Sequence, residues 1–311
     1  MMILGTEMTE RSKKRTFLKV NETMAIPLWL VAGGEPGPTL VISAGVHGCE
    51  YVGILTARKL YEEITPDGLK GRLIILPAIN EQGFYEGLKR IVPGDGKNLN
   101  RAFPGRLDGS DSEQMAYALE KYIYPEADFI IDLHGADVNE RMEPLVFFSK
   151  LAQEKVVDRS RTAAACLKVR YRVPSTARNG YYSYAALQGI PGMLLEIGGQ
   201  GLWSEDEVNQ CLGSVHSLMN HLGMTGEEET PMPGQKEALE VVYEEADNSG
   251  VWFPNIMPGQ HFTKGYVLGY VEDLSGQKRH ELIARFDGMV MYHTIALGVM
   301  KGDTLVAYGR F

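Results

Sequence analysis

The sequence predicts an α/β fold with a mostly parallel central sheet flanked by helices, followed by a small all-β domain. Short apolar runs rich in Ile, Leu and Val alternate with longer stretches of helical periodicity, which is the pattern of a parallel sheet with crossover helices. Towards the C-terminal end, short strand-like runs are separated by frequent glycines instead. We expect an α/β domain over 1–225, a linker over 226–234 and a β barrel or sandwich over 235–311.

Four segments have the composition of strands that are covered on both faces. They are Thr39–Ala44, Arg72–Pro77, Phe129–Leu133 and Met193–Ile197. In open α/β sheets, ligands bind in the crevice beyond the carboxyl ends of the strands. Polar residues at the ends of these segments are therefore the first candidates for a functional site.

Three segments carry apolar residues at helical spacing and are predicted helices. They are Glu50–Ile64, Ser112–Ile123 and Glu205–Leu222. The predicted linker, 226–234, is charged, rich in Pro and Gly, and without periodicity, which is typical of a connection between domains.

The overall composition argues against several classes of protein. A net charge of −9 is unlike the basic surface of a nucleic-acid binder, so no nucleic-acid partner is expected. There is no apolar run of about 18 residues and no secretory signal, so we expect no membrane association and a cytoplasmic location. Three widely spaced cysteines do not suggest a disulfide framework. The oligomeric state is left open, with a homo-oligomer compatible with the sequence.

Two histidines and one glutamate follow predicted strands. His47 and Glu50 lie at the junction between the first strand and its helix, and His134 ends the third strand. Imidazole nitrogen and carboxylate oxygen both suit Zn²⁺, and this set leaves one position open for water. We therefore predict one zinc ion per chain at these residues, with Asp132 on the same strand face as a partner for the His134 imidazole. The alternative for His134 is a hydrogen-bonded core histidine.

Glu196 lies within the fourth apolar run. A buried, unpaired carboxylate is unfavourable, so it needs a metal, a partner or a raised pKa. A general base beside an activated water meets that need, and we predict this role for Glu196. The alternative is a structural ion pair.

The loop after the second predicted strand carries Arg90, Asn100 and Arg101 among glycines and prolines. Because arginine binds carboxylates with two parallel donors, Asn100 and Arg101 are predicted to hold a substrate carboxylate. Arg90 is predicted to polarise the scissile carbonyl. The alternative is a surface loop whose arginines are solvated. Three further residues are left open as contacts of the pocket: Arg141, Arg178 and Tyr182.

Cys49 lies between His47 and Glu50 and is a candidate nucleophile. No further base is evident beside it, so a buried structural thiol is the favoured interpretation. Neither a GxSxG elbow nor a GxxxxGK[ST] loop occurs, which removes support for serine-esterase and P-loop chemistry.

Four motifs, GVHGCE, NLNRAFPG, DLHG and LLEIGG, occur in this order between residues 38 and 201. Together they resemble the succinylglutamate desuccinylase/aspartoacylase family of zinc carboxypeptidase-like hydrolases, whose members also tend to have a C-terminal β domain. The resemblance implies zinc at His47, Glu50 and His134, substrate binding at Asn100 and Arg101, acid/base catalysis at Glu196 and oxyanion stabilisation at Arg90. The form PGDGKNLNRAFPG is more similar to the bacterial branch that includes N-acetyl-diaminobutyrate deacetylase, which implies a small N-acyl amino acid as substrate.

Three functions are compatible with these residues. The preferred one is a zinc-dependent deacylase that releases a short acyl group from a small N-acyl amino acid or related amine that carries a carboxylate. The second is a zinc carboxypeptidase that acts on short peptides with the same residues. The third is a metal-free binding module that kept the fold, although the presence of His47, Glu50, His134 and Glu196 together argues against it.

Overall fold

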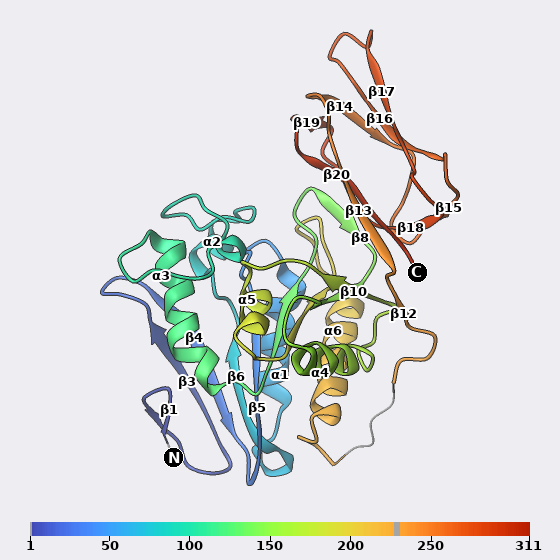
Figure 1. The fold of residues 1–311 in the computed structure, drawn as a ribbon. Coiled ribbons are helices and arrows are strands. Elements are labelled where there is room, and N and C mark those ends of the chain that lie inside the picture. The colour runs from blue at the N-terminus through green and yellow to red at the C-terminus, as the bar shows by residue number, and fades with distance from the viewer. Residues whose placement is uncertain (1, 227–230) are drawn as a thin grey trace.

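A computed structural model describes residues 2–226 and 231–311. The chain forms a broad α/β part, from which a narrower part made of antiparallel strands projects (Figure 1). The α/β part is built on a nine-stranded sheet with the order β12-β10-β9-β11-β7-β5-β6-β4-β3. This architecture confirms the predicted fold class. The linker predicted over 226–234 includes residues 227–230, which lie outside the described residues.

The four predicted strands are neighbours at the centre of this sheet. They are β11 (Gly192–Glu196), β7 (Phe129–His134), β5 (Glu35–Ala44) and β6 (Lys70–Leu76). All three pairings between them are parallel, so their carboxyl ends share one edge. Successive side chains alternate between faces, as Leu40 and Ile42 pack into one apolar core and Val41 into the other. Burial on both faces explains why these segments are mostly apolar.

Five further strands extend the sheet and were not predicted. β4 (Ala25–Ala32) and β3 (Ser12–Lys19) add antiparallel strands beside β6. On the other side, β9 (Leu145–Ser149) is antiparallel to β11, and β10 (Tyr171–Ser175) and β12 (Lys236–Glu237) continue in parallel. The edge strand β3 has the sequence SKKRTFLK, whose lysines and arginine suit an exposed edge but hide the apolar strand pattern.

Helices cover both faces of the sheet. The core on one face includes residues of α1 (Tyr51–Glu63), α4 (Glu154–Ala164) and α6 (Glu205–His221). The core on the other includes residues of α3 (Asp111–Ala118) and α5 (Tyr181–Leu187). The third predicted helix is α6, and the second is α3 continued by a π-helical turn, Leu119–Ile123. Among the described residues, no helix is both long and apolar enough to span a membrane.

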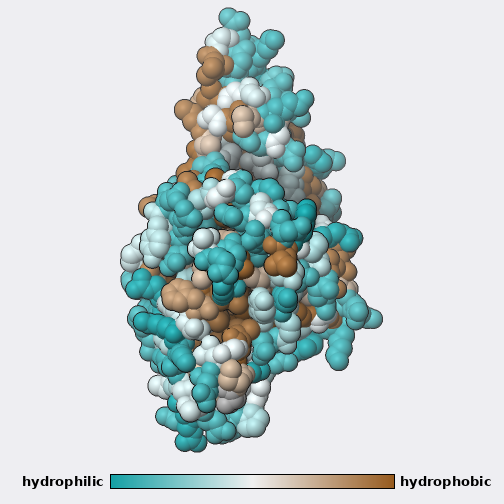
Figure 2. All heavy atoms as spheres, turned by 90° about the vertical axis from the view of Figure 1, so that its left-hand side faces the viewer, coloured by the Kyte–Doolittle hydropathy of each residue, from teal (hydrophilic) through white to brown (hydrophobic). Residues whose placement is uncertain are grey.

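The remaining elements of the α/β part are short. They are β1 (Met2–Ile3), β2 (Thr6–Glu7), α2 (Glu81–Tyr85) and the 3-10 turns Pro66–Gly68, Leu99–Arg101 and Tyr124–Glu126. Hydrophilic residues cover most of the face seen in Figure 2, with apolar residues in smaller groups between them.

The C-terminal part consists of two antiparallel sheets that pack as a sandwich. One contains β13 (Glu240–Glu245), β20 (Thr304–Arg310), β18 (Gly288–Thr294) and β15 (His261–Phe262). The other contains β17 (Arg279–Ile283), β16 (Val267–Glu272), β14 (Gly250–Pro254) and β19 (Gly298–Val299). Their shared apolar core includes Trp252, Leu268 and Val306.

Two strands cross between the parts. β8 (Glu140–Met142), which belongs to the α/β part by sequence, pairs with β18 of the sandwich. Conversely, β12 follows the predicted linker and so belongs by sequence to the C-terminal part, but it pairs with β10 of the nine-stranded sheet. Backbone hydrogen bonds therefore tie the sandwich to the edge of the sheet where the predicted functional residues lie.

Candidate active site and metal centre

His47 and Glu50 lie in the short connection between β5 and α1. Gly45 adopts a left-handed φ of 62°, and a Cβ on Gly48 would lie 2.2 Å from the backbone nitrogen of Phe84. Only glycine fits this close approach, and Glu50 follows as the residue before the first turn of α1. The tight connection brings both functional side chains to the carboxyl edge of the sheet.

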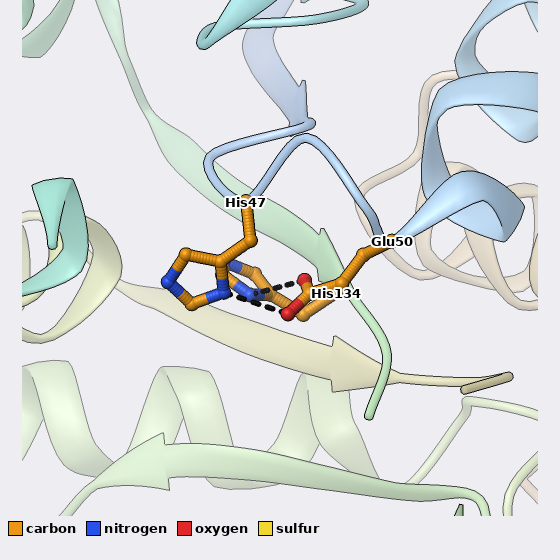
Figure 3. A group of neighbouring side chains, drawn as sticks. All are labelled: His47, Glu50 and His134. Atoms are coloured by element: carbon orange, nitrogen blue, oxygen red, sulfur yellow. Dashed lines mark hydrogen bonds and ion pairs between the residues drawn. The ribbon is translucent and has the colours of Figure 1, made fainter. Parts of the chain in front are cut away.

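His134, the last residue of β7, points at the same carboxylate (Figure 3). The Nδ1 atom of His47 lies 2.6 Å from Glu50 Oε1, and the Nδ1 atom of His134 lies 2.8 Å from Glu50 Oε2. One possible ligand atom from each of the three buried residues lies within 4.8 Å of the others. Two imidazole nitrogens and one carboxylate fit a single metal ion, and this donor set suits zinc.

The second nitrogen of each imidazole has its own oxygen partner. His134 Nε2 donates to Asp132 Oδ2 at 3.1 Å, as predicted, and His47 Nε2 donates to Asn98 Oδ1 at 3.1 Å. Asp132 is held in turn by the Ser43 hydroxyl at 2.7 Å. These partners place the proton of a neutral imidazole on Nε2 and leave Nδ1 available as a metal ligand. Asn98 was not predicted, although it is the first residue of the NLNR motif.

The charges in this cluster favour a cation at its centre. Burial alone would raise the pKa of Glu50, but His47 and His134 lower it to about 2. Burial alone would lower the pKa of His134, but Asp132 and Glu50 raise it well above its usual value. Both shifts have the same origin: carboxylates in a buried site stabilise positive charge between them. A divalent cation bound there would supply that charge.

Glu196 is the last residue of β11 and lies opposite His134 in the strand register. Its Oε2 atom is buried and has no hydrogen-bond partner among the described residues. Burial raises the pKa of Glu196 well above its usual value, although the neighbouring His134 opposes the shift. A carboxyl group with a raised pKa and an unused oxygen is suited to exchanging a proton with a bound molecule.

These side chains line a pocket of about 760 Å³. Arg90, Asn100, Arg101 and Tyr182 also line it, whereas Arg141 and Arg178 are not among its described lining residues. Arg141 instead donates to Gln200 Oε1 at 3.1 Å. The C-terminal part supplies one wall of the pocket, which sequence reasoning did not predict. Its residues there are Ala238, Leu239, Glu240, Val241, Tyr243, Glu245, Tyr292 and Thr304.

Asn100 and Arg101 lie in the 3-10 turn that follows Asn98. The Oδ1 atom of Asn100 accepts a hydrogen bond from Tyr181 N at 2.9 Å, at the start of α5, which leaves its amide NH₂ for another acceptor. Arg101 is exposed and donates from Nη1 to the Asn100 carbonyl at 2.7 Å, so its other donors are available. Both residues line the pocket, and their roles in substrate binding stay predictions.

Arg90 lines the pocket but is also paired with two acidic residues. Its Nε donates to Asp137 Oδ2, and its Nη2 donates to Glu140 Oε1 at 3.0 Å. Burial alone would lower the pKa of Arg90, but Glu140 and Asp137 raise it. Neither acidic residue was predicted, although both follow closely on His134 in the segment DLHGADVNE. The oxyanion role of Arg90 stays a prediction.

Cys49 is a buried thiol rather than an activated nucleophile. It is 1% exposed, and burial raises its pKa to about 11, so it is protonated at neutral pH. Its Sγ donates to Asp137 Oδ1 at 3.6 Å. This geometry supports the structural interpretation of Cys49.

Comparison with known proteins identifies the family and supports the fold. A model of the succinylglutamate desuccinylase/aspartoacylase catalytic domain matches residues 36–222. The N-alpha-acetyl-L-2,4-diaminobutyric acid deacetylase of Halomonas elongata is 28% identical over 290 residues, which cover 90% of this chain and 84% of the relative.

Two solved structures have the same fold over nearly the whole chain. The product-bound ectoine utilization protein EutE (DoeB) from Ruegeria pomeroyi has a TM-score of 0.88 at 24% identity and covers 98% of both chains. A succinylglutamate desuccinylase/aspartoacylase from Rhodobacter sphaeroides has a TM-score of 0.86 at 24% identity, with 96% of this chain and 95% of the other covered. The likeness extends over the C-terminal sandwich as well as the α/β part.

Proposed function

Because this chain belongs to the succinylglutamate desuccinylase/aspartoacylase family, we propose that it is a zinc-dependent deacylase acting on a small N-acyl amino acid or related amine. The family consists of metal-dependent amide hydrolases. The observation that carries the proposal is the position of Glu196, whose unpartnered Oε2 lies buried in the pocket next to the His–Glu–His cluster. In a metal-assisted hydrolysis, a proton acceptor of this kind close to the metal site activates the attacking water.

The proposed chemistry assigns a task to each group. When bound by His47, Glu50 and His134, zinc would act as a Lewis acid that polarises the substrate carbonyl and would lower the pKa of a bound water. Glu196 takes a proton from the attacking water and delivers it to the departing amine, for which a raised pKa is suited. Arg90 stabilises the negative charge that develops on the carbonyl oxygen.

Substrate orientation falls to Asn100 and Arg101 in this proposal. Their available donors hold the substrate carboxylate, so that binding energy fixes the amide relative to Glu196. The products are an amino acid or amine and a short carboxylic acid.

Two observations support a small substrate. The pocket volume of about 760 Å³ lies in the range of small-molecule sites, and the C-terminal sandwich closes one side of it. The Halomonas relative is named for the deacetylation of an N-acetylated diamino acid, which makes N-acetyl diamino acids the first substrates to test. A peptide substrate would need an open groove, and the wall that the C-terminal sandwich adds to the pocket makes such a groove less compatible with this structure. A cytoplasmic location stays a prediction.

The test combines metal analysis with a substrate panel. Zinc content is measured in the purified protein, and hydrolysis is followed for N-acetyl and N-succinyl amino acids, N-acetyl diamino acids and short peptides. We expect chelator-sensitive deacylation that is restored by zinc. Exclusive cleavage of peptides would establish a carboxypeptidase instead. Lack of zinc uptake together with lack of chelator-sensitive hydrolysis would indicate a metal-free binding module.

A further inference from the structure

We propose that Asp137 and Glu140 form a carboxylate clamp that positions the guanidinium of Arg90 in the pocket wall, and that β18 of the C-terminal sandwich braces this clamp. The proposal rests on the proposed function for the catalytic use of Arg90. Asp137 and Glu140 are positioning residues in it, because they act through Arg90. It also gives the C-terminal sandwich a task beyond closing the pocket.

The guanidinium of Arg90 is held through two of its nitrogens by two different carboxylates. Asp137 Oδ2 accepts from Nε and Glu140 Oε1 accepts from Nη2, so both the place and the plane of the group are fixed. Neither bond uses Nη1, which stays available to a carbonyl oxygen in the pocket. The backbone of Arg90 adopts a left-handed φ of 47°, which is uncommon outside glycine and persists where the surroundings hold it.

Asp137 links this arginine to the metal-ligand loop. Its side chain is 1% exposed, and its Oδ1 accepts from Val138 N at 2.7 Å and from the Cys49 thiol at 3.6 Å. Cys49 lies between His47 and Glu50 in the sequence. The same carboxylate therefore contacts both the loop that carries His47 and Glu50 and the Arg90 side chain that lines the pocket. In this way Asp137 fixes the position of the Arg90 guanidinium relative to that loop.

Glu140 links the arginine to the C-terminal sandwich. It opens β8, which lies at the base of the sandwich in Figure 1 and pairs with β18, where Glu140 lies opposite Thr294. The carbonyl of the preceding Asn139 accepts from Ile295 N at 2.7 Å and from the Thr294 hydroxyl at 3.0 Å. The end of β18 thus holds the backbone from which Glu140 reaches Arg90.

Chemical rescue of an Arg90 variant, in the full-length, zinc-loaded protein, distinguishes a positioning clamp from an ordinary structural ion pair. Arg90→Ala removes the guanidinium but leaves both carboxylates. Free guanidinium ion at millimolar concentrations, well below denaturing ones, should then restore activity in a saturable way. In R90A/E140Q, half-maximal rescue should need about tenfold more guanidinium, because one charge-assisted hydrogen bond is lost. The matched control is Arg101→Ala with and without E140Q, where Glu140 should not change any response to guanidinium.

A second measurement needs no activity. The Nε–H proton of Arg90, identified by NMR through its absence in R90A, should exchange slowly with solvent in the wild type. Exchange should become several-fold faster in D137N, and in Thr294→Val, which removes the hydroxyl that holds Asn139. Zinc content is measured in each variant to show that the metal cluster is intact.

The outcomes are distinct. Equal rescue of R90A and R90A/E140Q, or unchanged exchange in D137N, would overturn the clamp, and unchanged exchange in T294V would overturn the bracing role of β18. If the wild type hydrolyses no amide, the proposed function fails, while the exchange of the Arg90 proton still decides whether the clamp exists.

Discussion

His134 and Glu196 lie directly opposite one another as the last residues of the parallel neighbours β7 and β11. Neighbouring strands are about 4.8 Å apart, so backbone pairing alone brings a metal ligand and the proposed base to the same place. No loop has to order to form this pair. The separation between the metal cluster and the proposed base is therefore set by the backbone pairing of β7 and β11.

Glu196→Gln tests the base at this position. Glutamine keeps the shape of the side chain but cannot accept and return a proton, so we expect kcat to fall by about 10²- to 10⁴-fold. Zinc content should match the wild type, because Glu196 is not one of the metal-binding residues. Glu281→Gln, on the exposed strand β17, is the matched control and should leave kcat unchanged. Activity of E196Q within a few-fold of the wild type would rule out Glu196 as the base.

Asp132→Asn tests how the metal cluster is held. Asp132 accepts the Nε2 proton of His134, and a neutral amide orients this imidazole less strongly and makes it a weaker donor to the metal. We expect zinc affinity to fall by about 10- to 100-fold, measured by competition with a chelator. Activity at saturating zinc should recover in large part. Unchanged affinity would show that the Ser43–Asp132–His134 chain does not tune the site.

The centre of the sheet and the metal cluster were predictable from the sequence because both depend on local pattern. The four central strands each contain a mostly apolar run, and His134 and Glu196 each end one of these strands. Loop residues have no such periodic signal. Asn98 contacts His47 across 51 residues of sequence, and Asp137 contacts Arg90 across 47 residues. Both contacts form only when the chain folds, so the local sequence does not indicate them.

The pocket wall from the sandwich was not predictable for a related reason. Tyr243 and Tyr292 reach the pocket because β8 pairs with β18, across 150 residues of chain between Met142 and Tyr292. Strand pairing between domains depends on the register of both strands, and β8 is only three residues long. A segment this short carries no pattern that would identify its partner.

Arg101→Lys tests the predicted carboxylate contact. Lysine keeps the charge but loses the two parallel donors, so we expect KM to rise about tenfold or more while kcat changes less. Asn100→Ala is the informative comparison. Asn100 Oδ1 caps the backbone of Tyr181, so this variant should also lower the Tm, whereas the exposed Arg101 should not. If R101K lowers kcat and leaves KM unchanged, Arg101 does not hold the ground-state substrate.

Asp95 makes part of the stability of this protein dependent on pH. It lies just before the Asn98–Arg101 turn, and its carboxylate accepts from Ser112 N at 2.9 Å, from the Ser112 hydroxyl at 2.6 Å and from Lys97 N at 2.9 Å. Burial alone would raise the pKa of Asp95, but these hydrogen bonds outweigh it and lower the pKa. A carboxylate with a lower pKa in the folded state stabilises that state above its unfolded pKa, and the effect is lost as pH falls through the folded value.

Asp95→Asn removes this contribution, since the amide does not ionise. At pH 7 we expect the free energy of unfolding to be about 1–2 kcal/mol lower than in the wild type, measured by urea denaturation. The difference between the two proteins should shrink as the pH falls below about 4, the range where an unfolded aspartate takes up its proton. The comparison isolates Asp95 from the other carboxylates because they titrate in both proteins. A difference that stays constant from pH 7 down to pH 3 would mean that the ionised form of Asp95 is not what anchors this loop to α3.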